Sequence, residues 1–119
     1  VLFVEMMHYI MRNPVQGRSV EYNDNRISLY MAQYGKCAVS EYPLEIGKMH
    51  CHHKLPVYMG GSDEYSNLIF ITDTVHRLIH ATESDTISYY LMELKLEEKQ
   101  LKKLNKLRRQ AGLEEVAYE

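Results

Sequence analysis

The residues that decide the fold lie in one stretch, residues 48–80, with the sequence KMHCHHKLPVYMGGSDEYSNLIFITDTVHRLIH. Two segments in it, 48–55 and 68–71, are short and rich in apolar or alternating residues, which predicts strands. The connection over residues 57–66 contains two adjacent glycines, as expected of a turn between strands. The stretch therefore predicts a β-hairpin.

A helix is expected directly after this hairpin, because Thr72 or Asp73 is placed to cap it. The helix carries His76 and His80, and a spacing of four residues puts both imidazoles on one helix face. Two ligands placed in this way can hold one metal ion, as in other helical His-x-x-x-His sites. Alone, such a pair is also a common feature of solvated helix faces.

The adjacent pair His52-His53 on the first strand strengthens the metal hypothesis. Neighbouring residues on a strand point to opposite faces, so one imidazole can hold a metal ion while the other faces a substrate or water. A hairpin that returns through Asn67 into the helix of His76 and His80 brings both halves together. Three neutral imidazoles suit zinc or another first-row transition metal with a fourth position left open.

These residues resemble the signature of the HNH, or ββα-metal, nucleases. The matching residues are His52, His53, Lys54, Leu55, Pro56, Gly60, Gly61, Asn67, Leu68, Ile69, His76 and His80. Their spacing is similar to that of the bacterial colicin-type DNases. The surrounding segments 24–30, 35–39 and 101–112 resemble the C-terminal region of bacterial group II intron-encoded reverse transcriptase/maturases, a similarity that covers most of residues 13–116.

The resemblance implies a role for each matched polar residue. His53 corresponds to the general base, which takes a proton from the water that attacks the scissile phosphate. His52, His76 and His80 correspond to the ligands of one divalent metal ion, which stabilises charge on the phosphate and on the leaving 3′ oxygen. Asn67 corresponds to the middle residue of the signature and holds His53 in orientation. Magnesium or manganese is implied in function, whereas zinc or nickel also suits a three-histidine site.

The resemblance also implies the partners of the chain. The substrate would be double-stranded DNA, and the 3′ hydroxyl at the nick would prime a reverse transcriptase domain of the parent protein, with intron RNA as a further partner, in the bacterial cytoplasm. The net charge of the chain is −2, but residues 95–109 carry seven basic residues against two acidic ones. Lys54 and Arg77, beside the histidines, are candidates for contact with the DNA backbone.

The expected architecture is an α+β fold with a small ββα-metal unit flanked by helices. We divide the chain into an N-terminal segment and linker (1–22), an HNH core (23–83) and a C-terminal helical extension (84–119). Because the chain begins with Val1, the first segment is expected to be the remnant of a preceding domain. No apolar run approaches the roughly 20 residues that a membrane helix needs, so a membrane partner is not expected.

Helices flank the hairpin on both sides in this prediction. Residues 1–12 form a short apolar helix, and residues 13–23 form a linker. Asn23 or Asp24 caps the next helix, which Gly35 ends. Two further helices span residues 85–94 and 97–110. Their apolar positions and those of the preceding elements predict a core of Ile27, Tyr30, Val39, Leu68, Phe70 and the tail helices.

Three other interpretations stay open at this point. The chain can be a standalone HNH nuclease of the phage or restriction type. It can be a non-catalytic, metal-stabilised module that only binds DNA, or a structural metal domain of a larger assembly. His50 is expected on the surface, and Cys37 and Cys51 are expected as free thiols.

Overall fold

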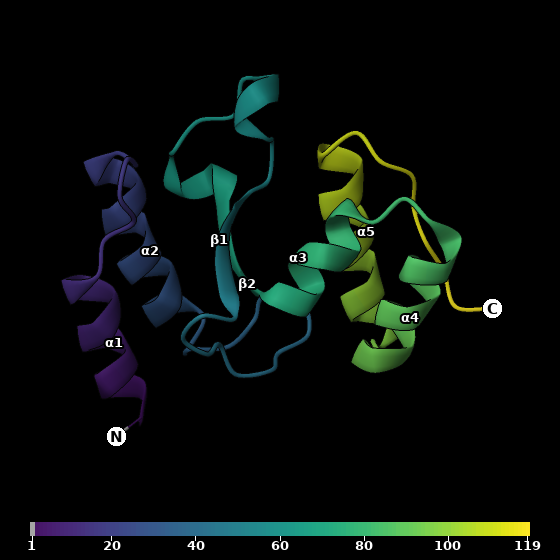
Figure 1. Cartoon of the computed structure of the whole chain (residues 1–119), viewed down its shortest axis with the longest axis horizontal. Coiled ribbons are helices and arrows are strands. Elements are labelled where there is room, and N and C mark those ends of the chain that lie inside the picture. Colours follow the sequence, from purple (N-terminus) through teal and green to yellow (C-terminus); the bar gives the residue numbers. More distant parts are fainter. Residues whose placement is uncertain (1) are drawn as a thin grey trace.

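A computed structural model describes residues 2–119 and contains five α-helices and one two-stranded antiparallel sheet within that range. The elements are α1 (Leu2–Arg12), α2 (Val20–Ala32), β1 (Met49–His53), β2 (Leu68–Thr72), α3 (Asp73–His80), α4 (Ser84–Leu94) and α5 (Glu98–Gln110), with short 3-10 turns at Val57–Met59 and Tyr65–Asn67. The α+β class is confirmed. Helices α1 and α2 lie on one side of the hairpin, and α3, α4 and α5 lie on the other (Figure 1).

The hairpin has the register that the sequence pattern requires. Met49 pairs with Thr72 at one end of the ladder, and His53 pairs with Leu68 at the other. Strand β1 is shorter than the predicted 48–55 segment, because the chain leaves the ladder after His53 and enters the connecting loop, whereas β2 extends one residue beyond the predicted 68–71. Since side chains alternate along β1, the hairpin presents two chemically different faces.

One face of the hairpin packs against α2. Cys51 lies opposite Phe70 on this face. The Tyr22 hydroxyl donates a hydrogen bond to the Cys51 carbonyl at 2.9 Å, and the ring of Tyr30 meets Phe70 edge-on with centroids 6.2 Å apart. The other face, which carries His52, packs against α3.

Helix α3 is held against the hairpin by a completely buried apolar stripe. Val75, Leu78 and Ile79 have no exposed surface. The last carbonyls of the helix are satisfied by the buried guanidinium of Arg108 on α5, which donates to the carbonyls of Leu78, Ile79 and Ala81. A helix end with orphan carbonyls is thus capped by a neighbouring helix, and α3 has a fixed position relative to β1.

The predicted core is largely confirmed. Tyr30, Val39, Leu68 and Phe70 are buried, whereas Ile27 is only partly buried at the edge of the core. The two cysteines are buried free thiols. The helices predicted at 85–94 and 97–110 are confirmed as α4 and α5, and Thr72 caps α3 by accepting from the Val75 amide at 3.4 Å.

The predicted start of α2 was wrong. We expected a linker over 13–23 and a cap at Asn23 or Asp24, but the helix begins directly after Ser19. The Ser19 hydroxyl accepts from the Tyr22 amide at 3.0 Å and is the N-cap. Serine, asparagine and aspartate cap helices about equally well, so propensity alone could not rank three candidates within six residues.

The side chain of Asn23 does not cap α2 but stabilises the preceding connection. It accepts from the Val15 amide at 2.7 Å and so fixes the connection between α1 and α2. The helix ends at Ala32, shortly before Gly35, whose backbone has a φ of 70°. Among residues 2–119 there is no helix with the length and apolar character needed to cross a bilayer.

Candidate metal and catalytic site

Three histidines that are far apart in the sequence converge between β1 and α3. His52 comes from β1, and His76 and His80 come from successive turns of α3. One ring nitrogen from each lies within 4.8 Å of the others, so the three are close enough to bind one metal ion. Tetrahedral coordination at ordinary zinc–nitrogen distances needs nitrogens roughly 3.3 Å apart, so side-chain closure of at most about 1.5 Å completes the set.

The state of these imidazoles suits a metal ion. The Nε2 atom of His52 is buried and has no hydrogen-bond partner among the described residues, an arrangement that is costly unless something binds the nitrogen. Burial lowers the pKa of His52 to about 3 and, together with the nearby His50, that of His76 to about 4. Burial lowers the pKa of His80 as well. The rings are therefore neutral at pH 7, with lone pairs available for coordination.

His50 lies at the edge of this cluster rather than on an unrelated part of the surface. Its ring stacks on that of His76 with centroids 4.2 Å apart. Its Nε2 atom is 3.1 Å from Oδ1 of Asp73, the first residue of α3. The expected exposure of His50 is confirmed, but its ring packs directly on His76 of the cluster, which the sequence pattern did not indicate.

His53 shares a small pocket with the three clustered histidines. The pocket has a volume of about 190 Å³ and is lined by His50, Cys51, His52, His53, Pro56, Val57, His76 and His80. His53 follows His52 on β1, so its side chain leaves the strand toward the opposite face, as alternation predicts. Its ring stacks on Tyr22 with centroids 5.4 Å apart and planes 13° apart.

The ring of His53 is also held by groups that the sequence analysis missed. Its Nε2 atom is 2.7 Å from Oδ1 of Asp63 in the hairpin loop. The same carboxylate accepts from Nη2 of Arg18 at 2.9 Å and from the hydroxyl of Ser19 at 2.6 Å. Arg18 and Ser19 are 35 to 45 positions from their partners in the chain, and Asp63 is ten positions from His53, so no periodic pattern links them.

Asn67 ties the two ends of the hairpin loop together. Its side-chain oxygen accepts from the Leu55 amide at 2.9 Å, and its side-chain nitrogen donates to the carbonyls of Leu55 and Ser62. Its backbone carbonyl accepts from the Lys54 amide at 2.7 Å. Asn67 thus fixes the backbone that directly follows His53, and its side chain makes no hydrogen bond to His53 itself.

Gly60 and Gly61 in the hairpin loop are needed for different structural reasons. Gly60 has a φ of 96°, a region that favours glycine. A Cβ atom at Gly61 would lie 1.7 Å from the Leu55 carbonyl oxygen, so a side chain has no room there. The loop is therefore a closely packed turn, and the two glycines are required for different reasons.

The candidate DNA-contacting residues have unequal surroundings. Arg77 is exposed, pairs with Asp73 at 3.1 Å and donates to the Tyr90 hydroxyl at 3.4 Å. Lys54 is partly buried and lines a pocket of about 200 Å³ together with Lys103 and Lys106 of α5. Within residues 2–119 Lys54 has no ion pair.

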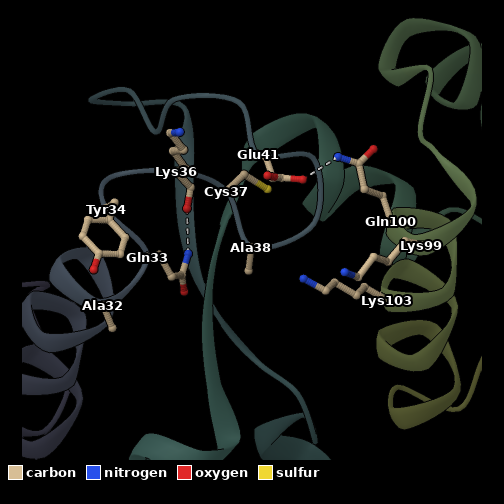
Figure 2. A pocket seen from close by; sticks show the side chains of 10 residues that line it. All are labelled: Ala32, Gln33, Tyr34, Lys36, Cys37, Ala38, Glu41, Lys99, Gln100 and Lys103. Atoms are coloured by element: carbon tan, nitrogen blue, oxygen red, sulfur yellow. Dashed lines mark hydrogen bonds between the residues drawn. The ribbon is translucent and has the colours of Figure 1, made fainter.

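A further hollow of about 510 Å³ lies between the segment after α2 and α5. Figure 2 shows Lys99 and Lys103 extending from α5 toward Ala38 at this hollow, with Lys36 farther along its rim. Gln100 donates to Glu41 across it at 3.1 Å. It shares no residue with the histidine pocket, so it is a separate feature of the surface.

Comparison of the chain with models of protein families, with curated proteins and with solved structures finds no match. What the site can do chemically therefore follows from its own geometry. That geometry has three parts. Three neutral histidines from β1 and α3 form a cluster. His53 lines the same pocket and has its ring held by Asp63, and Asn67 closes the hairpin loop.

Proposed function

We propose that this chain is a metal-dependent DNA endonuclease of the HNH type, which nicks a duplex by hydrolysis of one phosphodiester bond. The observation that carries the proposal is the pocket shared by His53 with the convergent set of His52, His76 and His80. A metal-binding cluster and an anchored histidine that line one pocket are the combination that phosphodiester hydrolysis needs. The order β1, β2, α3, with ligands from β1 and α3, supports the finer assignment of a ββα-metal unit.

The chain's own residues divide the chemical work between them. His52, His76 and His80 would hold one divalent ion, which supplies electrostatic stabilisation of the charge that develops on the phosphate and the leaving oxygen. His53 accepts a proton from water as the water oxygen forms its bond to phosphorus. The bond from phosphorus to the 3′ oxygen breaks, and its electron pair stays on that oxygen.

The electrostatic surroundings of the pocket support a phosphate substrate. Lys54 directly follows His53, has no ion pair among the described residues and lines a neighbouring pocket with Lys103 and Lys106, so these charges are available to a DNA backbone that passes the histidine pocket. Arg77 would first have to leave Asp73. Of the two candidates, Lys54 is therefore the stronger phosphate contact.

We further propose the biological setting that the flanking sequence suggests. In a group II intron maturase, the nick would supply the 3′ hydroxyl from which the reverse transcriptase domain of the parent protein copies intron RNA. The net charge of −2 fits a module that relies on its parent for much of its affinity for nucleic acid.

The direct test is nicking of supercoiled plasmid by the purified chain. The protein is first treated with a chelator and then supplied separately with magnesium, manganese, nickel or zinc. We expect metal-dependent nicking by the wild-type chain and none by His53→Ala. His8→Ala is the matched control, because His8 is an exposed histidine of α1 outside the pocket.

Binding of labelled duplex DNA, measured with the same variants, separates an enzyme from a DNA-binding module. If His53→Ala retains DNA affinity while nicking is lost, the residue acts in the chemical step. If the wild-type chain binds DNA and does not nick with any of the four metals, the nuclease proposal is wrong for this chain on its own.

A further inference from the structure

The carboxylate of Asp63 lies where it can determine which nitrogen of His53 is basic. Its Oδ1 atom is 2.7 Å from Nε2 of His53, a distance that requires a proton between the two atoms. Hydrogen bonds from His53 and Ser19 hold the pKa of Asp63 below its usual range. The carboxyl group is therefore ionised and can only accept, so the proton between the atoms belongs to the imidazole.

The position of Arg18 agrees with this proton assignment. Its Nη2 atom lies 2.9 Å from Oδ1 of Asp63 and 3.0 Å from Nε2 of His53. A guanidinium has only donors, and a protonated Nε2 has no lone pair to accept from it. Both N–H groups therefore converge on the same carboxylate oxygen, and the short contact between them results from the shared acceptor.

The aspartate itself is held from several directions. Its second oxygen accepts from the hydroxyl of Ser19, which also caps α2. Its backbone carbonyl accepts from the side chain of Asn25 at 2.8 Å. The side chains of Asp63 and His53 are only 20% and 14% exposed, so solvent competes weakly for their contact. The arrangement is thus fixed before any substrate binds.

We propose that Asp63 is a positioning residue that holds His53 in the Nε2–H tautomer and thereby leaves Nδ1 as the nitrogen that takes the proton from water. The proposal rests on the proposed nuclease function for the identity of the reaction. Nδ1 makes no hydrogen bond with any residue between 2 and 119. The stacked ring of Tyr22 limits rotation of the imidazole, so the carboxylate sets both the tautomer and the direction of the free lone pair.

Two variants of the described contacts separate positioning from simple anchoring of the loop. Asp63→Asn keeps the size of the side chain but removes the ionised acceptor. Ser19→Ala removes another bond to the same carboxylate, together with the cap of α2, and leaves the contact between Asp63 and His53 in place. Glu64→Gln removes one negative charge from the neighbouring exposed position and is the control for net charge.

The first measurement is the ring-nitrogen NMR spectrum of His53 at neutral pH in the full chain. We expect the wild-type protein to be protonated on Nε2, and Asp63→Asn to shift population toward protonation on Nδ1, because the new amide can donate to Nε2. Ser19→Ala and Glu64→Gln should retain the wild-type tautomer. A wild-type His53 protonated on Nδ1, or a tautomer that is the same in Asp63→Asn, would overturn the proposal.

The second measurement is the rate of plasmid nicking at saturating DNA and metal. Loss of the correct tautomer is expected to slow turnover roughly 10²- to 10⁴-fold in Asp63→Asn, with unchanged metal affinity. Ser19→Ala, which loosens the start of α2, should lose less activity than Asp63→Asn, and Glu64→Gln should stay within about tenfold of the wild-type rate. An equal loss in Ser19→Ala would identify a loop anchor and refute a positioning role. The NMR measurement of the His53 tautomer does not require DNA cleavage. A chain without nuclease activity therefore still tests whether Asp63 sets the tautomer.

Discussion

Replacement of His52 by leucine should make the metal-free protein more stable and at the same time abolish its response to metal. The Nε2 atom of His52 is buried without a partner, and the residue is only 5% exposed. An unsatisfied buried polar group costs about 1–3 kcal/mol, and an apolar side chain of similar size removes that cost. We therefore expect His52→Leu to raise the free energy of unfolding by about 1–3 kcal/mol in the presence of a chelator.

The stability advantage of His52→Leu over the wild type should shrink by about 2.7 kcal/mol when a metal ion is present. A metal at about 100 times its dissociation constant stabilises a folded protein by about 2.7 kcal/mol, provided that the unfolded chain does not bind it. The wild-type protein should gain this stability with zinc or nickel, whereas His52→Leu should gain almost none. Urea unfolding followed by circular dichroism, with and without metal, measures both quantities.

His8→Leu is the matched control for this experiment. His8 is exposed on α1, so its replacement should change stability by no more than about 0.5 kcal/mol and keep the full metal response. If His52→Leu destabilised the metal-free protein, the unpaired Nε2 atom of His52 would not carry the energetic cost assigned to it. A metal response that survives in His52→Leu would refute the ligand set itself.

Three other predictions concern the hairpin loop and the titration of His52 and His76. Asn67→Ala removes three side-chain hydrogen bonds across the hairpin loop and should lower stability by about 1–3 kcal/mol, with faster amide exchange confined to that loop; unchanged exchange would contradict the assigned role. The added Cβ of Gly61→Ala would lie 1.7 Å from the Leu55 carbonyl oxygen. Gly60→Ala adds only the strain of a left-handed residue, about 1–2 kcal/mol. Urea midpoints should therefore show that Gly61→Ala destabilises the protein more than Gly60→Ala. In the metal-free protein the pKa of His52 is about 3 and that of His76 about 4, both below the ordinary 6.5. As the pH falls, these two histidines therefore become protonated in the unfolded chain before they do so in the folded protein. The free energy of unfolding should then hold its full value above pH 6.5 and fall as the pH drops toward about 4, by at most about 1.4 kcal/mol per pH unit for each histidine, whereas a rise on acidification would contradict the burial of these rings.

Local patterns in the sequence predicted most of the elements and the convergence of His52, His76 and His80. Alternation over residues 48–55 and the spacing between His76 and His80 are local properties, and each specifies which face a side chain occupies. The tail helices likewise follow from apolar residues at helical spacing. These parts of the fold could be predicted because each depends on residues that are near one another in the chain.

The surroundings of His53 could not be predicted in the same way. The contact between Ser19 and Asp63 spans 44 positions, and that between Arg18 and His53 spans 35. Neither pair has a periodic signature, and the mistaken start of α2 concealed that Ser19 lies at the N-terminus of a helix. A correct assignment of that cap would have left its hydroxyl and the adjacent guanidinium as polar groups in need of a partner.

The two halves of the candidate site are held by different elements. The metal half depends on α3, whose position is set by its buried apolar stripe and by Arg108 at its C-terminus. The half around His53 depends on the start of α2 and on the hairpin loop, through Asp63. Strand β1 joins them, because alternation sends the two adjacent histidines to opposite faces. Variants that disturb one half should therefore leave the other intact, and metal affinity and the tautomer of His53 should vary independently across such variants.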